Sequence, residues 1–593
     1  GMFLEGDRWR YQLREGATVW DYVKHPLLSL MYYLYKLSVA FSWKFVFILC
    51  TAYGINQGMG EEWSGFAAKF YMADHLHLSP ARAAAARGLS LVPWQLKAIY
   101  GMISDVVPIM GYHKTGYMLI AGSCGVLAFF ILFALDLSFV PGILVFIVAH
   151  FSMASPDVMI DAAVAEKAKS HPQFAPDLQS LCWGSLGLGG FFAAATVGYM
   201  QESIGSRGIF GVCILTGVAI LVPAALGFLR EKRRDPSTIK PICLSCKQGL
   251  SDPLGKWVFY VAIIVTFVSV FLGFFAVFNE SEHSVIINGS VTVFCAICII
   301  FPSLLYCLSR ISLVLAKASS FIFLRGAIQP STTVLFYWYR KTRSNCERGY
   351  PCLDPGFLGW MDVAGYAFLF VGTIIYQKYF ASWSYRSIFI FAQVLLVFVN
   401  LMDLIWVTRL NVKIGISDKV FLLGEEVLGP IVRRLSEMPM LILAAKLCPS
   451  GVEATLFALN MGLSNFGVSI GDYLGQALLG ILGGVNPPDF NNLAVFILLK
   501  SLTRLLPILL VYPLVPKGSP LDDAFDIARR FAGEDEGSEV RARGESAIPL
   551  TDLKLSSSDN IHMHEDHERD ELVNRDDVGG VAVVGDDDEL GGL

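Results

Sequence analysis

Charged residues are scarce in this sequence: Asp, Glu, Lys and Arg together make up 16% of its 593 residues. An average soluble domain has about 25%. In their place, 54% of the residues are hydrophobic and 13% are aromatic. The apolar residues form blocks of about twenty, the length that spans a bilayer. This composition excludes an ordinary soluble domain and predicts an all-α polytopic membrane protein.

Several catalytic and metal-binding motifs are also absent. The sequence has no Gly-x-x-x-x-Gly-Lys-Ser/Thr loop, which argues against an ATP-driven pump, and no His-Glu-x-x-His pair. The Cys-x-x-Cys pairs that begin at Cys243 and Cys295 have no second pair at zinc-site spacing. We therefore expect no enzyme activity, metal, cofactor or nucleic-acid partner. Cys346 and Cys352 differ, since they flank a polar loop and are candidates for a disulfide.

Negative charge is concentrated in the last part of the chain. From Lys517 onward there are 21 acidic and 8 basic residues, a net charge of −13, whereas the whole chain carries −5. The remainder is therefore basic, with clusters in segment 1–38 and in the central loop 230–255. Because Lys and Arg concentrate in cytoplasmic loops, we expect both segments to be cytoplasmic. The acidic tail, 516–593, has little apolar material and is predicted to be largely disordered.

The apolar runs fall into two sets separated by the central loop. The first half, 39–229, contains runs at 39–60, 84–105, 116–138, 140–165, 180–201 and 207–229. Later runs occur at 256–278, 291–316, 318–339, 358–380, 385–408, 419–446, 452–482 and 491–515. We interpret the first two of these as an inserted hairpin, 256–316, before a second six-helix half, 317–515. This interpretation predicts fourteen spans, with twelve as the alternative. Sequons at Asn279 and Asn288 predict that the hairpin loop faces outside.

Three motifs carry a family resemblance. The first is Pro93-Trp94-x-x-Lys97 followed by Gly101-x-x-Ser104-Asp105-x-x-Pro108-Ile-x-Gly111-Tyr112. The second runs from Ser155 to Glu166, and the third from Phe321 to Tyr339. In this order they resemble the folate–biopterin transporter family of the major facilitator superfamily, over roughly residues 36–515. The resemblance implies a major facilitator fold, in which two six-helix halves rock about a central site. It also implies transport of folate or biopterin.

Charged residues inside the predicted spans are the first candidates for a site. A charge at the bilayer centre costs at least about 2.5 kcal/mol unless it has a partner or faces water. Asp157 and Asp161 share one helix face, which suits a proton-coupling site. Lys97 and Arg325 could bind a substrate carboxylate or pair with these aspartates. The candidates for substrate binding or coupling are Lys97, Asp157, Asp161, Arg325, Gln329 and Ser331.

Two further groups of candidates follow from position in the chain. The loop after the second span resembles the major facilitator loop that gates the inner mouth, with Gly101, Ser104, Asp105, Gly111 and Lys114 as its candidate residues. The second-half candidates are Asp403, Glu425, Arg434 and Asp472. The run 419–446 contains Pro430 and Pro439 and is predicted to be a broken helix beside the cavity. Asp472 lies among glycines whose spacing is typical of close helix packing.

The resemblance leaves the cargo open within a class of small metabolites. Folate and biopterin come first, with protons as the coupling ion. S-adenosylmethionine is the alternative, because the acidic pair could hold a cation. A non-transporting receptor or scaffold would need a soluble signalling domain, and none is visible. We expect an integral protein of the plasma membrane with both termini cytoplasmic. The sequence gives no indication of an oligomeric state.

Overall fold

The computed structural model describes residues 19–233, 254–279, 284–448 and 453–522. All of them belong to one compact unit, Gly1–Ala532, and most are helical. The predictions for residues 1–18, for most of the central loop and for the tail beyond Asp522 lie outside the described residues.

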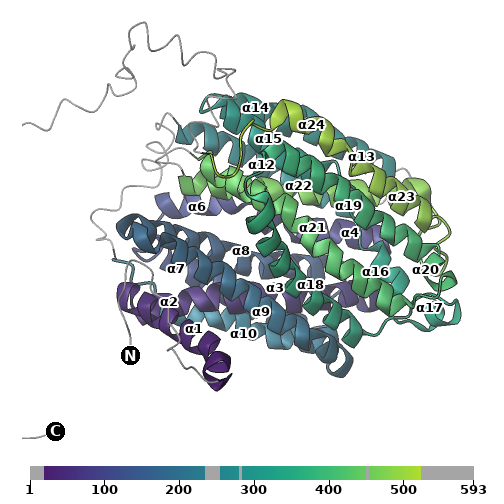
Figure 1. Cartoon of the computed structure of the whole chain (residues 1–593), viewed down its shortest axis with the longest axis horizontal. Helices are drawn as coiled ribbons and strands as arrows, with labels where there is room; N and C mark the ends of the chain where they lie inside the picture. The colour runs from purple at the N-terminus through teal and green to yellow at the C-terminus, as the bar shows by residue number, and fades with distance from the viewer. Residues whose placement is uncertain (1–18, 234–253, 280–283, 449–452, 523–593) are drawn as a thin grey trace, which may run out of the picture. The chain divides into compact units, whose positions relative to one another are not determined.

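Six helical spans follow one another in the first half (Figure 1). The first span is continuous over four segments, and the second is interrupted twice. The segments are α2 (Trp43–Cys50), η1 (Thr51–Met59), α3 (Gly60–Phe70) and η2 (Tyr71–His75); α4 (Pro80–Ser90), α5 (Val92–Gln95) and α6 (Lys97–Val106); α7 (Thr115–Ala134); α8 (Phe139–Ser170); α9 (Ala175–Ser203), preceded by η3 (Pro172–Phe174); and α10 (Gly205–Ala225).

A pair of helical spans separates the first half from the second. It consists of α12 (Gly255–Phe278) and of α13 (Ser284–Phe294), η5 (Cys295–Ile300) and α14 (Phe301–Ser309) in line. The second half is α15 (Leu313–Ala327) with α16 (Val334–Tyr339); α18 (Pro355–Ile375) with η6 (Tyr376–Phe380); α19 (Tyr385–Val407); α21 (Asp418–Lys446); α22 (Glu453–Leu482); and α23 (Leu493–Thr503) with α24 (Leu506–Leu514). The short α17 (Arg343–Glu347) and α20 (Leu410–Lys413) lie in loops.

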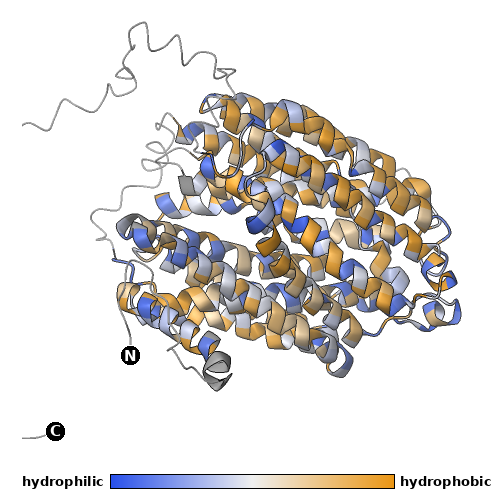
Figure 2. Ribbon diagram, in the orientation of Figure 1, coloured by the Kyte–Doolittle hydropathy of each residue, from blue (hydrophilic) through white to orange (hydrophobic). Residues whose placement is uncertain are grey.

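The arrangement of helical spans follows the predicted runs closely. Apolar residues dominate most of these helices (Figure 2). Nine helices within the described ranges are long and apolar enough to cross a membrane by themselves. The first two spans, α15 with α16, α21 and α22 are not among these nine, so the fourteen-span topology remains a prediction.

Two interfaces join the halves, and glycine permits both. The helix α9 packs along α18, and α22 packs against α4, α5 and α6. A Cβ atom on Gly198 would lie 2.4 Å from the Pro355 carbonyl oxygen, and one on Gly462 would lie 2.7 Å from that of Gln95. The backbones therefore approach too closely for any side chain, as in other membrane helix pairs.

The glycines around Asp472 serve the same purpose within the second half. A Cβ atom on Gly467, Gly471 or Gly475 would lie 2.4, 2.5 or 2.0 Å from a carbonyl oxygen of Phe323, Gln329 or Ser331. These carbonyls belong to α15 and to the segment after it. The glycine stripe of α22 therefore packs against the seventh span of the two-half core.

The first span begins later and extends further than the predicted run 39–60. The helix α1 (Val19–Phe41) precedes it, and the chain turns at Ser42, whose φ is 79°. The span then continues to His75. The predicted end was wrong because Glu61 and Glu62 interrupt the apolar run in the sequence, whereas in the structure they continue the helix as the first turn of α3.

The prediction of a broken helix at 419–446 was also wrong. The helix α21 is continuous through Pro430 and Pro439. A proline removes one backbone hydrogen bond, but a helix inside a bundle can absorb that loss through small local adjustments. The breaks lie elsewhere. They fall at Leu91 and Leu96 in the second span, at 328–333 between α15 and α16, and at 504–505 between α23 and α24. Counted without the inserted pair of spans, the last two breaks lie in the seventh and twelfth spans.

The loop between α16 and α18 is basic, although the predicted topology places it outside. Cys346 and Cys352 form a disulfide within it. Its four basic residues are all ion-paired: Arg340 with Asp74, Lys341 with Asp354, Arg343 with Glu347 and Arg348 with Asp489. The positive charges therefore have structural partners at this end of the bundle, which offers a reason why a loop predicted to lie outside can be basic.

Of the two sequons in the hairpin loop, only one suits a glycan. Asn288 is 2% exposed within α13, and its Oδ1 accepts a hydrogen bond from Asn279 Nδ2 at 2.8 Å. A bulky glycan does not fit at a buried position, so the prediction for Asn288 was wrong. Asn279 is half-buried at the end of α12 and remains a candidate.

We expect Asn279→Gln to abolish any glycosidase-sensitive shift in mass, because Asn279 is the one of the two sequon asparagines in this loop that can carry a glycan. The matched change Asn288→Gln should leave the shift in place. Gel mobility before and after glycosidase treatment measures both. An epitope tag in this loop that antibodies reach only after permeabilisation would contradict the outer placement.

Candidate functional site

Lys97 is placed by the break in the second span. The short α5 contains Pro93 and Trp94, and α6 begins at Lys97 itself. The Pro-Trp-x-x-Lys motif therefore marks the break, because proline lacks the N–H that a continuous helix would use. The Lys97 ammonium lies 2.5 Å from Asp157 Oδ2 on α8 and 4.6 Å from the centre of the Trp94 ring.

Asp157 and Asp161 have different partners, although they share a face of α8. Asp157 is buried, forms the ion pair with Lys97 and accepts a hydrogen bond from the Gln57 amide. Asp161 accepts one from the Tyr53 hydroxyl. Tyr53 and Gln57 both belong to η1, a π-helical stretch of a kind that is frequent at functional sites. Lys97 is therefore ion-paired with Asp157 and not with Asp161.

Glu61 adds a third carboxylate to this group. It interacts electrostatically with both Lys97 and Asp157. It is exposed, although it lies midway along the span from Trp43 to His75. We call Glu61, Lys97, Asp157 and Asp161 the first-half cluster. Its three carboxyl groups share one ammonium group.

A second pair of carboxyl groups joins the two halves. Glu62 of α3 accepts a hydrogen bond from the Tyr366 hydroxyl of α18 at 3.1 Å. Asp362 of α18 interacts electrostatically with Glu62, so two carboxyl groups from opposite halves lie near each other here. Lys69 and Glu426 interact with this pair electrostatically.

Asp472 joins the halves at the other interface. Its Oδ2 lies 2.7 Å from Arg87 Nη1 of α4, and Asp472 is 1% exposed. Close by, Gln95 Nε2 donates to Ser469 Oγ at 2.6 Å. Asp472 therefore holds α22 to the second span, in addition to lying within the glycine stripe.

Another buried group lies within the second half. Lys500 Nζ of α23 is 3.8 Å from Asp403 Oδ2 of α19, and the carboxyl group of Glu425 interacts electrostatically with both. Two carboxyl groups therefore lie near the one ammonium of Lys500.

Arg325 does not reach the aspartates of α8, although the sequence allowed such a pair. Its Nη1 donates to the Ser436 hydroxyl of α21 and, at 3.3 Å, to the Ser436 carbonyl. Gln329 Oε1 accepts from Arg504 Nη1 at 2.8 Å. Arg325 is separated from Asp157 because it belongs to the other half.

Two other candidates have contacts that hold helices together. The Ser331 N–H donates to the Gly471 carbonyl at 3.0 Å and so ties the seventh span to α22. Arg434 Nε donates to Thr373 Oγ1 at 3.0 Å, and its Nη1 lies 3.5 Å from Glu437. Arg434 therefore joins α21 to α18 through the neutral Thr373, while Glu437 is its charged partner within α21.

The candidate gating loop is held by an acid that the sequence did not single out. Glu231 accepts hydrogen bonds from the N–H groups of His113, Lys114 and Thr115, at the start of α7. A carboxylate is favourable at a helix N-terminus. Lys114 Nζ in turn lies 2.5 Å from Glu166 Oε1.

Asp105, the acidic candidate of this loop, is exposed, and Glu231 is the residue that caps α7. Of the other candidates, Ser104 Oγ donates to the Gly101 carbonyl at 2.8 Å, and Gly111 adopts a φ of 86° that favours glycine. A gating role for this loop remains a prediction.

Sequence reasoning missed several residues of these groups: Tyr53, Gln57, Glu61, Glu62, Arg87, Glu231, Lys500 and Arg504. For Glu61 and Glu62 a signal exists, because apolar sequence continues on both sides of them. For Tyr53 and Gln57 none does, since neither carries a charge. Their role depends on which face of the first span meets α8.

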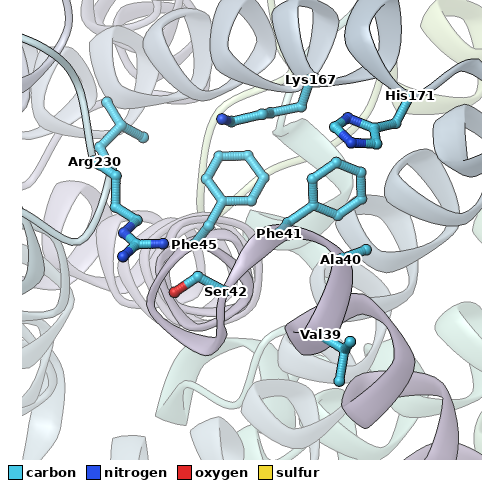
Figure 3. A pocket seen from close by; sticks show the side chains of 9 residues that line it. Val39, Ala40, Phe41, Ser42, Phe45, Lys167, His171 and Arg230 are labelled. Atoms are coloured by element: carbon cyan, nitrogen blue, oxygen red, sulfur yellow. The ribbon is translucent and has the colours of Figure 1, made fainter. Parts of the chain in front are cut away.

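A hollow of about 440 Å³ lies where α1 meets α2 (Figure 3). Phe41 and Phe45 line it together with Lys167, His171 and Arg230. No member of the first-half cluster or of the groups that join the halves lines this hollow, so we do not assign transport to it.

Comparison with known proteins identifies the family. The model of the BT1 family matches residues 57–534. The chain belongs to this family. The chain is therefore an integral membrane transporter of a small molecule, and the predicted family is confirmed.

Named relatives of this BT1-family transporter come from plants, bacteria and a parasite. "Probable folate-biopterin transporter 2" of Arabidopsis thaliana is 28% identical over 519 residues, 86% of this chain and 89% of the relative. "Folate-biopterin transporter" of Synechocystis sp. is 28% identical over 81% of this chain and 83% of its own length. "Folate transporter 1" of Plasmodium falciparum is 21% identical over 75% of this chain and 74% of its own length.

Solved structures confirm the major facilitator fold. A peptide transporter POT in complex with sulfate superposes on this BT1-family chain with a TM-score of 0.56 at 14% identity, over 82% of this chain and 96% of that one. The POT family transporter PepTSo superposes with a TM-score of 0.55 at 11% identity, over 83% of this chain and 99% of that one. At such low identity the likeness concerns the fold alone.

We expect Lys97→Met and Asp157→Asn each to lower the yield and thermal stability of the folded protein. Each change leaves one group of a buried ion pair without its partner, which typically costs about 3–5 kcal/mol. The double variant should recover much of the loss, whereas Lys97→Met combined with Asp161→Asn should not. Size-exclusion profiles and melting temperatures in detergent measure this. Equal recovery in the two double variants would contradict the assignment of Asp157 as the partner.

Proposed function

We propose that this transporter imports folate or biopterin by alternating access, with the cargo held between the two halves. The names of its relatives support this cargo class. The observation that carries the proposal is the contact between Glu62 and Tyr366. It brings charged and polar groups of both halves together near mid-span, which is where a transporter built from parallel repeats binds its substrate.

The contacts between the halves indicate which end is closed. Arg340 pairs with Asp74, and Glu202 Oε1 accepts from the Gly356 N–H at 2.9 Å. These contacts lie at the end of the bundle that carries the disulfide, which we predict to be outside. Glu61 is exposed from within the bundle, in support of water access from the opposite end. We therefore interpret this conformation as closed to the outside.

Proton coupling fits the first-half cluster. Three carboxyl groups there share one ammonium, so the cluster has room for a proton that can be gained and lost during transport. Asp161 is the best candidate, because it lacks the direct ion pair that Asp157 has with Lys97. We further propose location in the plasma membrane, with both termini cytoplasmic. S-adenosylmethionine remains the alternative cargo, since the same carboxylates could hold its positive charge.

Uptake into vesicles tests the cargo. We expect labelled folate or biopterin to accumulate above the background of vesicles without the protein, with an excess of the unlabelled compound competing. An inward proton gradient should raise the level reached. Competition by S-adenosylmethionine and not by pterins would overturn the preferred cargo.

Asp161→Asn tests the coupling site. The amide keeps the shape of the side chain but does not cycle a proton, so we expect loss of proton-driven accumulation while exchange of internal for external substrate continues. Asp161→Glu, which keeps a carboxyl group, serves as the control and should retain accumulation. If folded Asp161→Asn still concentrates substrate with unchanged pH dependence, Asp161 has a structural role only.

A further inference from the structure

Three arginines of the second half lie within electrostatic range of one another. Arg504 interacts with both Arg325 and Arg433, and it donates to Gln329, four residues after Arg325. Arg325 in turn donates to Ser436, three residues after Arg433 on α21. They come from three spans: Arg325 from α15, Arg433 from α21 and Arg504 from the residues between α23 and α24. Each lies close to the middle of its span, judged from the helix bounds. Positive charges at this depth require a reason, because they repel one another and are costly to bury.

None of the three is in an ion pair within the described part of the chain. Arg325 donates only to Ser436 and Arg504 only to Gln329, both through neutral oxygens. The Nε of Arg504 is buried and without a hydrogen-bond partner there. Arg433 has no hydrogen bond among the described residues and is exposed, although it lies halfway along α21.

The neighbouring acids lie close to other cations. Asp403 is 3.8 Å from Lys500 and acts on Arg504 only at longer range. Glu437 lies beside Arg434 at 3.5 Å and acts on Arg325 only at longer range. Glu426 interacts with Arg433 but also with Asp362 and Lys69. Among the described residues, no carboxylate therefore lies at ion-pair distance from any of the three guanidinium groups.

Two of the three arginines also lie beside breaks in their helices. Arg325 is two residues before the end of α15, where residues 328–333 interrupt the seventh span. Arg504 lies between α23 and α24. Discontinuous helices at mid-membrane leave backbone groups free for a ligand, and they are typical of substrate sites in secondary transporters.

We propose that Arg325, Arg433 and Arg504 form the binding site for the carboxylate end of an anionic substrate. A guanidinium group binds a carboxylate bidentately with two parallel hydrogen bonds, and three such groups suit a ligand with two carboxylates. Folate has two carboxylates in its glutamate end, whereas biopterin has none and S-adenosylmethionine carries net positive charge. The inference rests on the proposed function and narrows it: among the proposed cargoes, the arginine site selects folate.

The test compares folate with biopterin in single arginine variants. In Arg433→Gln and Arg504→Gln we expect KM for folate to rise by roughly tenfold or more, since a hydrogen bond to a charged group contributes about 1.5–3 kcal/mol and 1.4 kcal/mol is a factor of ten. KM for biopterin should change less than about twofold by the same scale. Arg504→Lys keeps the positive charge but lacks the two parallel N–H donors of a guanidinium group. Its KM for folate should lie between the values of wild type and Arg504→Gln.

Arg386→Gln is the matched control. It removes the same charge from the same half, but Arg386 donates only to the backbone carbonyls of Val515 and Tyr512. It should leave the ratio of folate to biopterin uptake unchanged. Size-exclusion profiles establish that each variant folds. The ratio is measured within one preparation, so a lower yield of folded protein does not alter it.

The outcomes separate the two proposals. If wild type transports folate and biopterin but the variants lose both equally, or lose neither, the arginine site is wrong and the proposed function stands. If wild type transports neither compound, the proposed function itself fails. A selective loss of folate uptake in Arg433→Gln and Arg504→Gln, absent in Arg386→Gln, supports the site.

Discussion

The ion pair between Lys97 and Asp157 shows the constraint on which the rest of this structure depends. An ammonium and a carboxylate are buried between two spans, and neither is stable there without the other. To bring them together, the second span breaks at Leu96, so that Lys97 begins a new helix beside α8. The first span adopts a π-helical stretch that turns Gln57 and Tyr53 toward the same aspartates.

The two halves meet this constraint in different ways. The first-half cluster has an excess of carboxyl groups over cations, whereas the second half has three arginines without carboxylate partners within the described residues. Between them, Glu62, Asp362 and Tyr366 bring polar groups of both halves into contact. The acidic group of one half and the basic group of the other suit the proposed cargo with a charged end and the proposed coupling to a proton.

Close packing makes these contacts possible. The backbones of α9 and α18, and of α22 and its neighbours, approach at glycines where a single Cβ atom would collide with a carbonyl oxygen. In a bilayer, apolar side chains gain little from leaving lipid, so helix association depends on such contact and on hydrogen bonds between helices. The glycine stripe of α22 therefore both holds the seventh span and places Asp472 opposite Arg87.

The sequence by itself determined the class, the family and the order of the spans. Apolar runs of bilayer length and three motifs are local features, and they need no knowledge of which helices touch. It also identified Lys97, Asp157 and Arg325, because a charge inside an apolar run is visible without a structure. Only the tertiary structure decided the partners: Asp157 and not Asp161 for Lys97, Ser436 and not an aspartate for Arg325. These pairs join residues 60 and 111 positions apart, and pairing depends on how each helix is rotated and where it breaks. The structure also decided that the helices continue through Glu61, Glu62 and Pro430, where the sequence predicted an end or a break.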